Sequence, residues 1–239
     1  MSNYRLTDEQ RSLKEAARRF AENKLRPIAL ETERKGEAMP REALKLMAEN
    51  GYVGLDIPTE YGGLGLDIMG CAVVLEELSS VWFSASTNAM SLLTGPLLVF
   101  GTDEQKQNYL PAISSGNLLT AFALTETDAG SDASSIQTFA ARDGDDWVIN
   151  GRKIYITNGA RADLIVLFAR TDRDAPRGEG ITLFLIAKVG AQTRSSSGQS
   201  PLFSIVSSPS STRAKSLPSV SLSSHQRRTT RSRRKLCFG

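Results

Sequence analysis

The hydrophobic pattern changes twice along this 239-residue chain, and the two changes limit what it can fold into. Up to Leu118, apolar residues recur at helical spacing in segments separated by short loops. From there to Lys188 the apolar runs are short and strand-like, and after Lys188 neither period remains. Helices followed by strands predict an α+β class, with an all-helical domain over residues 1–118 and an antiparallel β domain over 119–188.

Local signals divide the helical region into elements. Thr7-Asp-Glu-Gln10 and Thr102-Asp-Glu-Gln105 both match the capping box, so each predicts the start of a helix. The apolar stretch from Ser84 to Phe100 predicts a buried helical element that breaks near Gly95-Pro96. Pro111 is predicted to close the last helix, because proline disrupts a helix interior.

The second region contains four strand signals. Leu119–Thr125 is an apolar run that ends at a polar loop, and Leu164–Ala169 and Ile181–Ala187 are two more apolar runs. Within Trp147–Ile156, the pair Asn150-Gly151 is the one that type I′ hairpin turns prefer. We therefore predict antiparallel strands with Asn150-Gly151 at a hairpin tip.

Residues 189–239 differ in composition from the rest of the chain. Fifteen of these 51 residues are serine and nine are basic, with no acidic residue, whereas residues 1–188 hold 20 basic and 26 acidic residues. The net charges, +9 and −6, sum to the +3 of the whole chain. Such a segment buries too little apolar surface to offset its ordering entropy, so we predict a disordered Ser/Arg-rich tail.

The tail has two interpretations. The basic run Arg227–Lys235 could bind nucleic acid or anionic lipid electrostatically. Alternatively, a frameshift within the gene would produce an abrupt loss of pattern, a biased composition and an early end. We favour the frameshift, because the pattern is lost in the middle of the predicted β domain.

Several classes of protein are excluded by composition. Cys71 and Cys237 are too few for a disulfide framework or a metal cluster, and this usage is typical of a reducing compartment. His225, the only histidine, lies in the tail, so a His base or a Ser–His pair is not expected. No apolar stretch approaches the roughly 20 residues that cross a bilayer. Together with the lack of a signal-peptide pattern, this predicts a cytoplasmic protein without membrane contact.

One segment combines a strand with a loop of hydroxyl and small side chains, Phe122-Ala-Leu-Thr-Glu-Thr-Asp-Ala-Gly-Ser-Asp132. Thr125 and Ser131 can donate hydrogen bonds, and Gly130 permits close approach of a ligand. Such a loop could hold a polar ring edge and a pyrophosphate. On composition alone, an ordinary turn stabilised by its own Asp and Ser side chains is the more frequent explanation.

Pro58–Gly65, Phe100–Pro111, Phe122–Asp132 and Tyr155–Gly159 are four motifs that together resemble the acyl-CoA dehydrogenase family. Phe122–Asp132 is similar to the family's flavin signature, and Tyr155-Ile-Thr-Asn-Gly159 is similar to its second flavin motif, which usually begins with tryptophan. Pro58–Gly65 and Phe100–Pro111 also match, in the family's order. The resemblance extends from about Leu6 to Lys188. It implies an FAD cofactor, and it makes the β domain incomplete and the family's C-terminal helical bundle missing.

The resemblance implies roles in cofactor binding. Thr125 and the backbone of Leu124 would contact the pyrimidine end of the flavin. Thr157 would hydrogen-bond the flavin near N5, with Ile156 beside it in the same motif. Tyr155, in place of the usual tryptophan, would pack on the flavin edge.

Three further residues are implied at the substrate side. Phe122 would face the thioester end of the substrate while also touching the cofactor. Ser131, preceded by Gly130, would lie where the FAD pyrophosphate and the CoA moiety converge. Thr127 stands where the family commonly has proline, which loosens the loop slightly.

The reaction implied by the resemblance is an α,β-desaturation of an acyl-CoA thioester by anti elimination. The electrons would pass to an electron-transferring flavoprotein, and the family forms homo-oligomers, either tetramers or dimers. The family's base is a glutamate in the C-terminal bundle, so no catalytic residue is assigned here. Glu126 is interpreted as a turn or capping element. We therefore expect this chain alone to be an inactive fragment that binds FAD weakly or not at all.

Two alternatives stay open. The chain could belong to a related acyl-CoA oxidase or flavin monooxygenase of the same fold. It could also be a non-enzymatic protein that uses its basic tail, although nucleic-acid binding is not what the resemblance favours.

Overall fold

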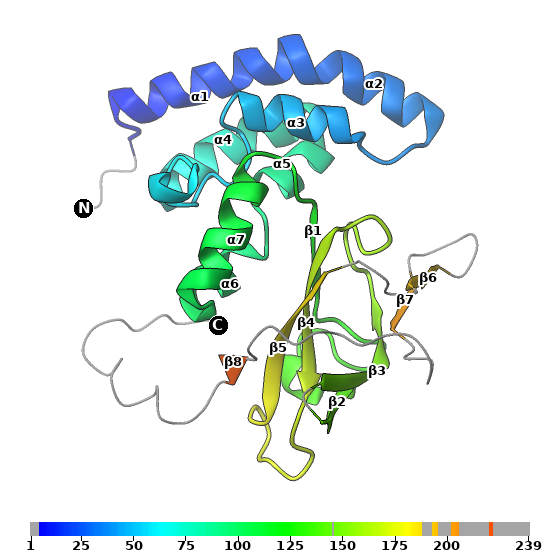
Figure 1. Ribbon diagram of the computed structural model, residues 1–239. Helices are drawn as coiled ribbons and strands as arrows, with labels where there is room; N and C mark the ends of the chain where they lie inside the picture. Colours follow the sequence, from blue (N-terminus) through cyan, green and yellow to red (C-terminus); the bar gives the residue numbers. More distant parts are fainter. Residues whose placement is uncertain (1–4, 145, 188–192, 196–201, 206–219, 222–239) are drawn as a thin grey trace. The chain divides into compact units, whose positions relative to one another are not determined.

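The computed structural model describes residues 5–144, 146–187, 193–195, 202–205 and 220–221. The chain divides into two compact units, Met1–Thr120 and Ala121–Gly239. Helices make up the first unit, and strands dominate the second (Figure 1). The predicted α+β class is confirmed.

The helical unit begins with one long continuous helix, drawn in blue in Figure 1. It is continuous because a π-helical turn joins its two α-helical parts without a break. In order, the elements are α1 (Asp8–Phe20), the π-helical turn (Ala21–Leu25), α2 (Arg26–Lys35), α3 (Arg41–Glu49), a 3-10 turn (Thr59–Tyr61), α4 (Ile68–Val81), α5 (Phe83–Ala89), α6 (Thr94–Phe100) and α7 (Asp103–Ser114).

Both predicted capping boxes are confirmed. At the start of α1, the Gln10 amide donates to the Thr7 hydroxyl at 3.1 Å, and the Thr7 amide donates to Gln10 Oε1 at 3.0 Å. At the start of α7, the same two hydrogen bonds join Thr102 and Gln105 at 3.2 Å and 2.9 Å. Each box satisfies two amides that the helix itself leaves unpaired.

Of two proline-based predictions in this unit, one is confirmed and one is wrong. The apolar stretch breaks near Gly95-Pro96 as predicted, between α5 and α6 over residues 90–93, and Pro96 itself lies in the first turn of α6. Proline is tolerated there because a first-turn amide has no partner within the helix. Pro111 lies inside α7, which continues to Ser114. Leu110 and Ile113 are both buried, so packing of this face keeps the last turn helical.

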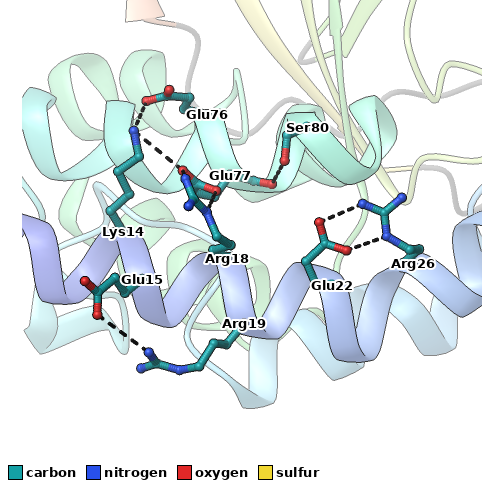
Figure 2. A network of polar contacts seen from close by, with 9 residues as sticks. All are labelled: Lys14, Glu15, Arg18, Arg19, Glu22, Arg26, Glu76, Glu77 and Ser80. Atoms are coloured by element: carbon teal, nitrogen blue, oxygen red, sulfur yellow. Dashed lines mark hydrogen bonds and ion pairs between the residues drawn. The ribbon is translucent and has the colours of Figure 1, made fainter.

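A network of charged side chains joins α1 to α4 (Figure 2). The Glu77 side chain is only 5% exposed, and it accepts from Arg18 Nε at 2.8 Å and from Arg18 Nη2 at 2.9 Å. Lys14 Nζ lies 2.8 Å from Glu76 Oε2 and 3.5 Å from Glu77 Oε1. The Arg18 hydrogen bond holds the pKa of Glu77 below its usual value, although burial of the carboxylate opposes this.

Replacing this carboxylate tests the network. We expect Glu77→Gln to lower the free energy of unfolding by about 1–3 kcal/mol at neutral pH, as for the loss of a hydrogen bond to a charged group. A depressed folded-state pKa gives stability that is present above the unfolded pKa of about 4.3 and is lost as the pH falls through the folded pKa. The difference between wild type and variant, measured by urea unfolding, should therefore shrink below about pH 4.

The matched control for that experiment is Glu76→Gln. The Glu76 side chain is 64% exposed, and its contact with Lys14 is screened by water, so little change is expected. Equal effects of the two substitutions would contradict a specific role for the buried carboxylate.

The second unit is built on one mixed sheet with the strand order β6-β7-β3-β2-β4-β5-β8, in which β1 also pairs with β4. The strands are β1 (Thr120–Ala123), β2 (Phe139–Asp143), β3 (Asp146–Ile154), β4 (Leu164–Arg170), β5 (Ile181–Ala187), β6 (Thr193–Ser195), β7 (Leu202–Ile205) and β8 (Val220–Ser221).

The sheet is mixed rather than purely antiparallel. β4 and β5 pair antiparallel from Leu164↔Ala187 to Arg170↔Ile181. β2 and β4, however, run parallel and pair at Phe139↔Arg170. The reason lies in the chain path: β3 folds back along one edge of β2, so β4 occupies the other edge in the same direction as β2.

The predicted hairpin tip at Asn150-Gly151 is wrong. β3 continues through both residues, with Asn150 paired to Phe139 and Gly151 paired to Ile205. The β2–β3 hairpin instead turns at Gly144, whose φ is +61°. Gly151 meets a packing requirement, because a Cβ at this position would lie 2.2 Å from Thr138 Oγ1. Glycine inside a strand often marks such a close approach.

Alternate residues of the strands build the core of this unit. Trp147 on β3 contacts Phe184 on β5 edge to face, with ring centroids 5.4 Å apart. This arrangement suits the aromatic quadrupoles. The buried hydrophobic residues of this core cluster are Ala121, Ala123, Ala140, Ile149, Ile156, Ala162, Ile165, Leu167, Ala169 and Phe184.

The segment predicted to be disordered, 189–239, is described only at the short strands β6, β7 and β8. The basic run Arg227–Lys235 lies outside the described residues, so the predicted disorder stays a prediction. Within the described part of the chain, no helix has the length and apolar character to cross a membrane.

Candidate functional site

The end of β1 lies beside the end of β3. The backbone amide of Ile154, the last residue of β3, donates to the carbonyl of Thr125 at 3.0 Å. This bond places Leu124 and Thr125 next to the segment that begins at Tyr155. We call this place, residues 124–125 together with 154–157, the junction. Two motifs that are some 30 residues apart in the sequence therefore meet beside the end of β3.

A tight turn follows this junction. The Glu126 amide donates to the Ala129 carbonyl at 2.9 Å, and the Ala129 amide donates back at 3.3 Å. Gly130 and Ser131 come directly after the turn and are exposed. No atom lies within 4 Å of the position of a Cβ on Gly130, so the loop leaves space at this point.

Tyr155 has an unusual backbone conformation. Its φ of +56° lies in the left-handed region, and 72% of its surface is exposed. A bulky residue in this region is an outlier that costs roughly 1–2 kcal/mol. Thr157 is exposed as well, whereas the side chain of Ile156 is buried in the core. Only the backbone of Ile156 is therefore available to a ligand.

Phe122 lies on β1 and is half-buried. Its ring packs against that of Phe168 on β4, with centroids 5.0 Å apart. The remaining exposed part of the ring is what a ligand could contact.

A buried ion pair, which sequence reasoning missed, supports the junction from inside. Lys153 on β3 is 1% exposed, and its Nζ donates to Glu126 Oε1 and to the Leu124 carbonyl, both at 2.8 Å. The Glu126 carboxylate also accepts from the Gln137 amide at 2.6 Å and from the Thr138 amide at 2.9 Å. One signal was available: Ile149, Gly151 and Lys153 share one face of β3 by strand alternation.

The pair has shifted pKa values. Burial lowers the pKa of Lys153, and the neighbouring Glu126 opposes this shift. Burial alone would raise the pKa of Glu126, but the hydrogen bonds from Lys153 and from the amides of Gln137 and Thr138 lower it below its usual value. Glu126 is therefore a poor proton acceptor, which supports the interpretation of this residue as a structural element.

A second set of polar contacts holds the segment after the loop. The Asp132 carboxylate accepts hydrogen bonds from the hydroxyls of Ser134 and Ser135 and from the guanidinium of Arg177. These donors hold the pKa of Asp132 far below its usual value. Arg170 on β4 donates to the Ser134 carbonyl at 2.8 Å. The chain beyond Ser131 is thus tied to β4 and to the loop that follows it.

The exposed groups at the junction are of the kinds that could contact a planar ring with a polar edge. Tyr155 has an exposed aromatic ring, and Thr157, on the same segment, is exposed at the surface with its hydroxyl-bearing side chain. Thr125 is half-buried beside them, and Gly130 leaves open space further along the loop. Among the described residues, no group of three or more His, Cys, Asp and Glu could hold a metal ion.

Comparison with known families gives two adjacent matches. Residues 7–117 match the acyl-CoA dehydrogenase N-terminal domain, and residues 121–202 match the acyl-CoA dehydrogenase middle domain. The second match includes the Phe122–Asp132 loop and the Tyr155–Gly159 segment, and it extends beyond Lys188.

Individual proteins agree with this. The chain is 42% identical over 192 residues to a short-chain specific acyl-CoA dehydrogenase of Clostridium acetobutylicum, covering 78% of this chain and 49% of that protein. A chain in the solved structure of the electron transferring flavoprotein of Acidaminococcus fermentans superposes with a TM-score of 0.77 at 35% identity, covering 90% of this chain and 58% of that chain.

A glutaryl-CoA dehydrogenase of Mycobacterium smegmatis, solved in complex with FADH2, superposes with a TM-score of 0.75 at 25% identity, covering 91% of this chain and 56% of that chain. The chain spans about half the length of the curated relatives it matches. Both structural units thus correspond, in order, to consecutive domains of one family, and the chain belongs to the acyl-CoA dehydrogenase family.

Proposed function

We propose that the whole protein is an FAD-dependent enzyme that desaturates an acyl-CoA thioester between its α and β carbons. The observation that carries the proposal is the bond from the Ile154 amide to the Thr125 carbonyl. It joins the hydroxyl-containing loop to the exposed Tyr155 and Thr157, and the solved relative with FADH2 supports a flavin as the ligand.

The residues of the junction would act by binding and orientation. Bound FAD would supply the hydride acceptor of the reaction. The Thr157 hydroxyl would donate a hydrogen bond near flavin N5, and Leu124 and Thr125 would contact the pyrimidine edge. Tyr155 would cover one edge of the ring and exclude water. Ser131 would donate to the pyrophosphate or to the CoA moiety, since neutral donors bind anions well.

Gly130, Ile156 and Phe122 complete the proposed set. Gly130 would allow the pyrophosphate to approach the backbone, because the space beside it is open. Ile156 would contribute its backbone only, since its side chain is buried. Phe122 would present the free part of its ring to the thioester end of the substrate.

None of the described carboxylates is proposed as the base that removes the α-proton. Glu126 is the acidic residue nearest the motif in sequence, and it is engaged by Lys153 and two backbone amides. A group held in this way would lose those hydrogen bonds on accepting a proton, which disfavours general-base catalysis. We infer that the base comes from outside the two matched domains.

The same proposal includes partners and location. An acyl-CoA ester is the proposed substrate, and an electron-transferring flavoprotein is the proposed electron acceptor, supported by the similarity to a chain in that structure from Acidaminococcus fermentans. A homo-oligomer and a cytoplasmic location are proposed with them. The free, buried thiol of Cys71 is compatible with a reducing compartment.

The Thr157 contact can be tested directly. In the full-length protein, with FAD titrated to saturation, we expect Thr157→Val to alter the visible absorption spectrum and the reduction potential of the flavin, because one hydrogen bond near N5 is lost. The loss in binding free energy should be about 0.5–1.5 kcal/mol.

Thr127→Val is the matched control, because Thr127 is exposed in the neighbouring turn and is not among the proposed contacts. The contact is refuted if bound flavin has the same spectrum and potential in wild type and Thr157→Val. Acyl-CoA-dependent oxygen uptake by the flavin-loaded protein, without another acceptor, would indicate an oxidase instead.

A further inference from the structure

We propose that Lys153 and Glu126 are positioning residues that hold the loop 124–138 in the shape that receives the flavin. The proposal rests on the proposed flavin site, because it assigns a role to groups that lie behind that site. Neither residue would touch the flavin.

The contacts of the pair reach both ends of the loop. At its beginning, Lys153 Nζ donates to the Leu124 carbonyl at 2.8 Å. At its end, the Glu126 carboxylate accepts from the amides of Gln137 and Thr138 at 2.6 Å and 2.9 Å. The 2.8 Å contact between Lys153 and Glu126 therefore closes the loop at its base.

The groups at the loop surface depend on this closure. Leu124 and Thr125 lie at the tied base, whereas Gly130 and Ser131 lie exposed beyond the turn that Glu126 begins. A loop of this length has many open conformations, and tying its ends removes most of them. Ligand contacts must be held within a fraction of an ångström, which supporting hydrogen bonds achieve.

Stability alone is a weak reason for such a pair. Lys153 is 1% exposed and Glu126 is 7% exposed, so two charges have been removed from water. Replacing a buried ion pair by uncharged residues of similar size is often neutral for folding, whereas removing one partner is strongly unfavourable. A role in folding and a role in positioning therefore make different predictions for the double variant.

The experiment compares Lys153→Met, Glu126→Gln and the double variant in the full 239-residue chain. Three quantities are measured: the urea midpoint, amide hydrogen exchange across 124–138, and FAD affinity by fluorescence titration. Arg152→Met and Asp128→Asn are the matched controls, because both side chains are exposed next to the pair. The controls should leave all three quantities unchanged.

The single variant Lys153→Met should lower the urea midpoint, because it leaves Glu126 charged and buried. The double variant should recover most of the midpoint. The amide hydrogens of its loop should still exchange at least about tenfold faster than in wild type, because the Leu124 carbonyl has lost its donor. For the same reason the double variant should bind FAD about tenfold more weakly.

The outcomes separate the two proposals. If amide hydrogen exchange across 124–138 in the double variant equals that of wild type, the positioning role is overturned, whatever the FAD affinity of the variant. If exchange rises but the double variant binds FAD as tightly as wild type, the pair shapes the loop without serving the cofactor, and the positioning role also fails. If wild type binds no FAD even in the whole protein, the proposed flavin site fails. In the 239-residue chain alone an absence of binding is expected, and there the exchange result by itself decides whether the pair holds the loop.

Discussion

Gly151→Val is expected to lower the free energy of unfolding of the β unit by roughly 1–3 kcal/mol, the usual cost of forcing extra atoms into a packed site. A Cβ on Gly151 would lie 2.2 Å from Thr138 Oγ1 and 2.6 Å from Thr138 Cβ. Thr138 cannot easily move away, because it is 2% exposed and its amide is bound to the Glu126 carboxylate. The upper end of the range is therefore expected.

Gly130→Ala is the control for this substitution, since nothing lies within 4 Å of its Cβ position. We expect no loss of stability, and a small gain from the lower entropy of the unfolded chain. Urea unfolding followed by tryptophan fluorescence measures both variants, because Trp147 packs in the same sheet. A Gly151→Val chain as stable as Gly130→Ala would show that β3 and the Thr138 segment do not approach as closely as described.

Tyr155→Asn is expected to have opposite effects on stability and on ligand binding. Asparagine tolerates the left-handed backbone far better than tyrosine, so the φ of +56° would become less costly. The free energy of unfolding should rise by about 0.5–1 kcal/mol. In the full-length protein the FAD affinity should fall about tenfold, because the proposed aromatic contact with the flavin edge is lost.

Tyr155→Phe separates the ring from the hydroxyl in this experiment. It keeps the aromatic face and should bind FAD nearly as wild type does. Fluorescence titration gives the affinities and urea unfolding gives the stabilities. If Tyr155→Asn binds FAD as tightly as Tyr155→Phe, the exposed ring does not contact the flavin, and its strained backbone needs another explanation.

The sequence by itself determined the features that depend on neighbouring residues. Thr7 and Thr102 begin helices because each capping box is completed within four residues. The apolar runs that became β4 and β5 are strands at the predicted places. The α+β order and the family resemblance followed from the same local patterns. The assignments of individual residues to the flavin and the substrate stay predictions.

Tertiary structure decided wherever a local preference competed with a distant contact. Asn150-Gly151 prefers a turn, yet both residues lie within β3 because Phe139 pairs with Asn150 and Thr138 packs against Gly151. Pro111 disfavours a helix, yet α7 continues because its last turn is buried.

The ion pair of Lys153 and Glu126 is the clearest case of the same kind. The two residues are 27 positions apart, and neither has a local pattern that points to the other. Burial and pairing of their charges arise only when β3 lies beside the loop after β1. Local propensities amount to about 1 kcal/mol or less per residue, whereas an unpaired buried charge costs several, so the long-range contacts determine these positions.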